Sequence, residues 1–101
     1  MIDSTREPSD AVVEYVVQWC RERSDRVSEL FVESRVGKTL FYIVPRSDEY
    51  NFELGFEQSK LDLYLNRHGA IGYAETRQIP GWDLDTFVGH KAHRIWTTDQ
   101  N

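Results

Sequence analysis

Residues 50–69 read YNFELGFEQSKLDLYLNRHG, and the fold depends on whether this stretch forms one helix or two strands. Its apolar residues alternate with polar ones, which is typical of a strand hairpin with a turn at residues 57–60. On a helix, the same residues fall on two opposite sides. One side carries Tyr50, Leu54, Leu61 and Leu65. The opposite side carries Phe52, Phe56 and Leu63.

The end of this stretch favours the helix. Arg67 and His68 place cationic side chains in a last turn, and Gly69 follows at the position where helices often stop. We therefore predict a helix over Glu49–Arg67, capped by Ser47 or Asp48. Gly55 within it costs about 1 kcal/mol relative to alanine. The second apolar side of this helix needs a cover, either the C-terminal segment or another subunit.

The sequence before this helix predicts a helix and a hairpin. A helix over Asp10–Arg23 follows from one apolar stripe, formed by Val12, Val13, Val16, Val17 and Cys20. Two β-rich runs follow at Val27–Ser34 and Lys38–Pro45, with Gly37 in a left-handed conformation between them. The second run is apolar on both faces and is therefore expected inside the sheet.

The sequence after residue 69 predicts a strand and a weak helix. Ile71–Ile79 reads as a strand that lies at an edge of the sheet or has a solvated face, because Glu75 and Arg77 lie in its middle. Apolar residues at helical spacing predict a broken helix over Leu84–Trp96 that packs back on the domain. The order is α–β–β–α–β–α over a single domain, residues 1–101, with residues 1–8 as a flexible leader. We expect a small α+β fold with a mostly antiparallel three-stranded sheet and helices packed on one face.

The amino-acid composition argues against two classes of partner, nucleic acids and membranes. The net charge of −5 opposes binding to nucleic acids and to anionic membranes. Leu40–Val44 is the longest apolar run and is far shorter than the ~20 residues of a membrane-spanning helix. Cys20 is the single cysteine, so no intramolecular disulfide forms and a cytoplasmic location is expected. No cofactor is expected.

The densest group of metal-capable side chains lies near the C-terminus. It consists of Asp83, Asp85, His90 and His93. On a helix, His90 and His93 share a face, as a two-histidine metal site requires. The glutamate of a metalloprotease helix is missing, and no cysteine lies near in sequence. A small metal-dependent module or enzyme is therefore an alternative function.

A second alternative is a nucleic-acid accessory protein that uses Lys91, Arg94 and Trp96. The negative net charge disfavours it. Cys20 lies on the apolar stripe of the first helix, where a free cysteine is usually an inert core residue rather than a nucleophile.

The aromatic content favours an interaction surface. Three Trp, five Tyr and five Phe exceed what a core of this size can bury, so some of them are exposed. The predicted interface residues are Tyr50, Phe52, Phe56, Trp82 and Trp96. Our leading interpretation is a protein-interaction or scaffold domain rather than an enzyme. It binds a protein partner or itself, as a homodimer, through the second face of the Glu49–Arg67 helix or through the edge strand.

Overall fold

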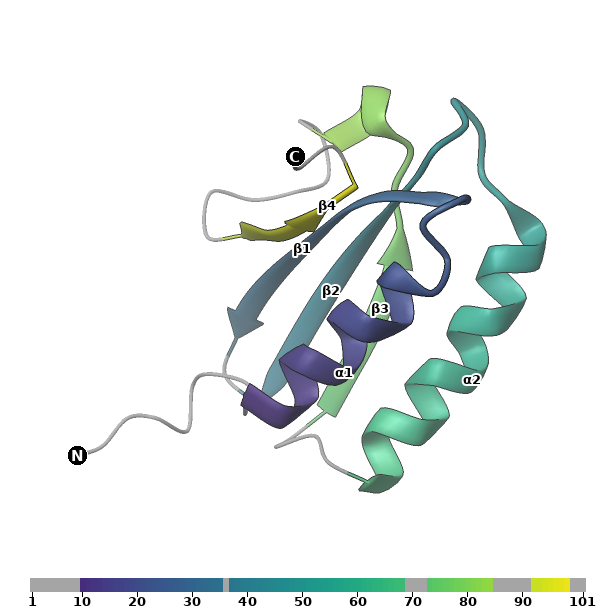
Figure 1. Ribbon diagram of the computed structural model, residues 1–101. Coiled ribbons are helices and arrows are strands. Elements are labelled where there is room, and N and C mark those ends of the chain that lie inside the picture. The colour runs from purple at the N-terminus through teal and green to yellow at the C-terminus, as the bar shows by residue number, and fades with distance from the viewer. Residues whose placement is uncertain (1–9, 36, 69–72, 85–91, 99–101) are drawn as a thin grey trace.

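The elements of the fold follow the chain in the order α–β–β–α–β–β (Figure 1). The computed structural model describes residues 10–35, 37–68, 73–84 and 92–98. The elements are α1 (Asp10–Arg21), β1 (Val27–Arg35), β2 (Lys38–Pro45), α2 (Phe52–His68), β3 (Tyr73–Gln78), the short 3-10 helix η2 (Gly81–Asp83) and β4 (His93–Thr97).

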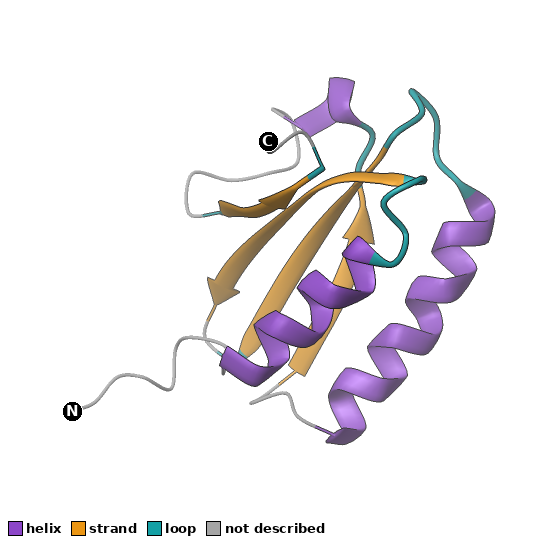
Figure 2. Ribbon diagram, viewed as in Figure 1, coloured by secondary structure: helices purple, strands orange, loops and turns teal. Residues whose placement is uncertain are grey.

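The strands form one four-stranded sheet in the order β3-β2-β1-β4. β1 pairs antiparallel with β2 on one side and with β4 on the other. β2 and β3 are parallel, so the chain must cross over between them, and α2 is that crossover. Both helices lie on the same face of the sheet (Figure 2).

Residues 52–68 of the long ambiguous stretch do form one helix, α2. α2 starts at Phe52 rather than Glu49, and its cap is neither Ser47 nor Asp48. Instead, the Asn51 Oδ1 atom accepts a hydrogen bond from the Leu54 backbone N–H at 3.0 Å. An asparagine at this position satisfies a backbone donor that the helix itself leaves open.

The N-terminal half of the predicted fold is confirmed. α1, β1 and β2 lie within two residues of their predicted bounds. Gly37 has φ of 73°, the left-handed conformation predicted for the hairpin. β2 lies inside the sheet and β3 at its edge, as their sequences indicate.

The prediction for the C-terminal half was wrong in two respects. His93–Thr97 is a strand rather than the end of a helix over Leu84–Trp96, and residues 85–91 lie outside the described residues. The sheet is therefore mixed and four-stranded, not a mostly antiparallel sheet of three strands. β1 has one edge that β2 leaves unpaired, and the backbone of β4 satisfies it.

The main core lies between the sheet and the two helices. Its fully buried members include Val16, Cys20, Leu30, Phe41 and Leu65. A smaller apolar cluster occupies the helix-free face, where Leu84 and Ala92 pack against Leu40, Tyr42 and Ile79. Segments on either side of residues 85–91 thus pack back on the domain, as the apolar residues of that region predicted.

Candidate functional site

The inner side of α2 faces the sheet. Leu54, Leu61 and Leu65 are buried there in the main core. Next to them, the buried Gln58 donates a hydrogen bond from Nε2 to Thr76 Oγ1 at 3.1 Å. Gln58 also accepts one at Oε1 from Gln78 Nε2 at 3.1 Å. The contact between α2 and the sheet is therefore apolar at the leucines and polar on the flank that carries Gln58.

The polar flank of α2 covers the outer edge of β3. The side-chain amide of Asn66 bonds both backbone groups of Ala74, accepting from N–H at 2.9 Å and donating to C=O at 2.8 Å. Asp62 Oδ1 accepts from the Thr76 N–H at 2.9 Å. Burial raises the pKa of Asp62, and the bonds from Thr76 oppose that rise. At these positions, side chains of α2 satisfy backbone groups of β3 that would otherwise pair with a neighbouring strand.

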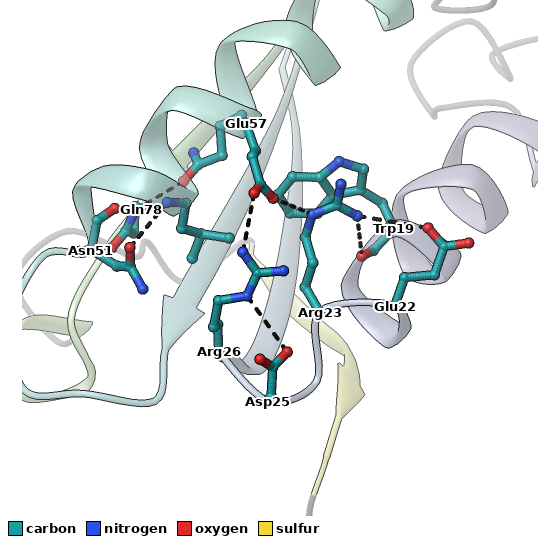
Figure 3. A network of polar contacts seen from close by, with 10 residues as sticks. Trp19, Glu22, Arg23, Asp25, Arg26, Asn51, Glu57 and Gln78 are labelled. Atoms are coloured by element: carbon teal, nitrogen blue, oxygen red, sulfur yellow. Dashed lines mark hydrogen bonds and ion pairs between the residues drawn. The ribbon is translucent and has the colours of Figure 1, made fainter.

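The opposite flank of α2 is tied to the end of α1 and the link that follows it. Glu57 accepts hydrogen bonds from Arg23 at 2.6 Å and from Arg26 at 3.1 Å (Figure 3). The hydrogen bond from Arg23 is the main cause that holds the pKa of Glu57 below its ordinary value. Partial burial opposes this effect and Arg26 reinforces it. Along the same flank, the rings of Tyr15 and Tyr64 stack with centroids 4.4 Å apart.

The remaining side of α2 points away from all of these contacts. Phe52, Phe56 and Leu63 lie on it, with 80%, 66% and 64% of their surfaces exposed. We call these three residues the outer stripe. Single exposed apolar residues are ordinary, but three large ones aligned on one helix are a feature of interaction surfaces.

Two further aromatic residues, Tyr50 and Trp82, lie in or against the loop that leads into α2. The Tyr50 ring packs edge-on against Phe52, with centroids 5.0 Å apart. A Cβ atom on Gly55 would collide with the Tyr50 hydroxyl, so this glycine leaves room for the tyrosine. Trp82, 72% exposed, donates a hydrogen bond from Nε1 to the Asp48 carbonyl at 2.7 Å.

Four of the five predicted interface residues are therefore exposed, and three of them gather at the N-terminal half of α2. Trp96 is different, because it lies half-buried on β4 and packs against the main core. Leu63 belongs to the outer stripe but was not among the predicted interface residues. The helical projection places Leu63 on the same side as Phe52 and Phe56, and this was the signal that could have added it to the predicted interface.

Charged side chains flank the outer stripe. Glu53, Lys60 and Arg67 are all exposed, and the Lys60 ammonium lies 5.0 Å from the centre of the Phe56 ring. A shallow depression of about 500 Å³ runs along this part of α2 and is lined by Phe52, Glu53, Phe56, Glu57 and Lys60. The surface thus combines apolar rings with charges of both signs.

Only two of the four predicted metal-binding residues lie in the part of the chain that the structure describes. Asp83 lies in η2 and His93 in β4, whereas Asp85 and His90 lie outside the described residues. Among the residues that the structure describes, no three His, Cys, Asp or Glu side chains are grouped to hold a metal ion. Because His93 belongs to a strand, the helical spacing of the two histidines no longer argues for a shared face.

The two described residues of the nucleic-acid alternative, Arg94 and Trp96, contact different parts of the fold. Arg94 bonds Glu29 at 3.3 Å, Trp96 packs on the core, and Lys91 is outside the described residues. A second depression of about 350 Å³ is lined by Arg21, Ser24, Arg46 and Trp96–Thr98. Cys20 is fully buried, and burial raises the pKa of its thiol to about 12, which makes it a poor nucleophile.

Comparisons of this chain with protein-family models, with curated proteins and with solved structures found no match. Among the described helices, none is long and apolar enough to cross a membrane. The arrangement of the residues themselves is therefore the basis for a functional conclusion.

Proposed function

We propose that this chain is a protein-interaction domain, and that its binding surface is the outer stripe of α2 with Tyr50 and Trp82 beside it. The partner is a protein that offers an apolar surface to Phe52 and Phe56. A cytoplasmic location belongs to the same proposal, since the single cysteine, Cys20, is a free, buried thiol.

The observation that carries the proposal is the exposure of the outer stripe. Phe52 is 80% exposed at the start of a helix whose inner side and two flanks contact the rest of the fold. Leaving such rings in water forgoes roughly 25 cal/mol for each Å² of apolar surface that a partner would cover. Aromatic side chains dominate the energetics of protein interfaces, because they bury a large area with few rotatable bonds.

The rest of α2 supports the same conclusion. Glu57, Asp62 and Asn66 hold the helix through hydrogen bonds to the link that follows α1 and to β3. A surface held rigid in this way loses little conformational entropy when it binds a partner. The stripe is therefore presented on a fixed support rather than on a loop.

The test is capture of partners from native lysate with the 101-residue chain as bait. We expect the Phe52→Ser/Phe56→Ser double variant to lose the proteins retained by the wild type. A Glu14→Ser variant, exposed on α1, serves as control and should retain them. Circular dichroism confirms that both variants fold. The proposal is overturned if the double variant and the wild type retain the same proteins and associate to the same extent.

A further inference from the structure

We infer that the partner of the outer stripe is a second copy of this chain, with the two α2 helices packed antiparallel about a two-fold axis. This inference rests on the proposed function and names its partner. It follows from how apolar and charged side chains are distributed along α2.

The charges of α2 lie on one flank of the outer stripe and change sign along it. With about 100° per residue, Glu53, Lys60 and Arg67 all project within about 60° of Phe56, on the side toward Tyr64. Glu53 is in the first turn, and Arg67 is in the last. The helix is thus acidic at one end of the flank and basic at the other.

An antiparallel pair brings the same flank of both helices together. In such a pair, the acidic end of one α2 meets the basic end of the other, twice by symmetry. A parallel pair would set the two Glu53 carboxylates at one end and the two Arg67 guanidinium groups at the other. Charge complementarity therefore selects the antiparallel arrangement.

The apolar residues give nearly the same register. If the two-fold axis passes between residues 59 and 60, Phe56 of one copy lies opposite Leu63 of the other. The pairing of Glu53 with Arg67 of the second copy needs an axis at residue 60, which lies half a residue, about 0.75 Å, farther along the helix. The apolar pairing and the charged pairing thus place the axis within half a residue of each other. Lys60 falls beside that axis and faces its own counterpart, which limits the affinity.

The helix dipole accounts for only part of this pattern. It favours an acid such as Glu53 at the N-terminal end and a cation such as Arg67 at the C-terminal end of any single helix. It gives no reason for Phe52, Phe56 and Leu63 to lie exposed between them. Self-association explains both the charges and the apolar residues.

The experiment is sedimentation equilibrium of the full chain across a wide concentration range. We expect a concentration-dependent dimer that the Phe56→Ser substitution abolishes. Reversing one charge, as Glu53→Arg or Arg67→Glu, should weaken the dimer about tenfold, because each reversal creates two repulsive pairs. The double reversal Glu53→Arg/Arg67→Glu should restore it to within about threefold of the wild type. Lys60→Gln should tighten it about threefold by removing the repulsion at the axis.

Circular dichroism of each variant separates loss of folding from loss of association. The inference is overturned if the wild type is monomeric at every concentration, or if the double reversal stays as weak as the single reversals. A monomeric wild type that still captures a protein through Phe52 and Phe56 would refute the second copy as partner and leave the proposed function intact. A dimer that Phe56→Ser leaves unchanged would refute the inferred interface.

Discussion

The two helices lie on the same face of the sheet but use their apolar residues differently. α1 buries Val16 and Cys20 completely, and its largest aromatic residue, Trp19, is only 7% exposed. α2 buries its inner leucines and also carries the outer stripe, which is 64–80% exposed. Packing within this chain accounts for most of the apolar pattern of α1. It accounts for only half of that of α2, and the other half is what an interaction partner would explain.

Two leucines of α2 that are two residues apart test most directly whether its inner and outer sides contribute differently to stability. Leu65 is 1% exposed and Leu63 is 64% exposed. We expect Leu65→Ala to lower the free energy of unfolding by about 2–5 kcal/mol, because it opens a cavity in the core. Leu63→Ala should change it by less than about 0.5 kcal/mol at concentrations where the chain is monomeric. Urea denaturation measures both, and equal losses would show that Leu63 is packed within the monomer.

The contribution of Glu57 to stability, through its ion pairs with the link after α1, can be tested by changing the pH. The pKa of Glu57 in the folded chain is below its ordinary value of 4.5. Its contribution to stability is therefore present above about pH 4.5 and is lost as the pH falls through the folded pKa. We expect Glu57→Gln to cost about 1 kcal/mol at pH 7, because two arginines lose their partner. The variant should also lose less of its stability between pH 5 and the acid range than the wild type.

The control for this prediction is Asp25→Asn. The Asp25 side chain is 75% exposed and contacts Arg26 at 3.5 Å, so its removal should change stability little. Denaturation at a series of pH values compares the three proteins. A Glu57→Gln variant whose stability falls in acid as much as that of the wild type would mean that these ion pairs do not hold α2 to the link after α1.

The smallest expected effect is at Gly55, where α2 gives up helix propensity to accommodate Tyr50. Gly55→Ala should raise the free energy of unfolding by about 0.5 kcal/mol, because the gain of up to about 1 kcal/mol is partly offset by displacement of the Tyr50 ring. In a Tyr50→Ala background, the same substitution should give the full gain. Thermal unfolding of the four proteins measures the coupling, and purely additive effects would mean that the ring and Gly55 are independent.

The parts of the fold that the sequence predicts well are those with strong local signals. The stripe of α1, the all-apolar run of β2 and the turn at Gly37 each determine their own conformation. β4 could not be predicted in this way, because Ile95 and Trp96 become a strand only when the edge of β1 is available to pair with them. A short apolar run is compatible with either structure until its neighbour is known.

The same division applies to the candidate site. Phe52 and Phe56 were identified from the sequence, because a helix with two apolar sides cannot bury both against one sheet. The anchoring residues of α2 were missed, although Gln58, Asp62 and Asn66 are spaced four residues apart. Their role depends on β3 being an edge strand parallel to β2, and no local pattern in the sequence specifies that pairing.

The way in which Asn66 and Asp62 cover the outer edge of β3 also bears on how this chain misfolds. Only while α2 is docked do these side chains occupy the Ala74 and Thr76 backbone groups. A partly opened chain, in which α2 has come away, would expose a strand edge that can recruit strands from other molecules. Loss of the side-chain bonds at residues 62 and 66 would thus increase aggregation by more than the accompanying loss of free energy of unfolding alone predicts.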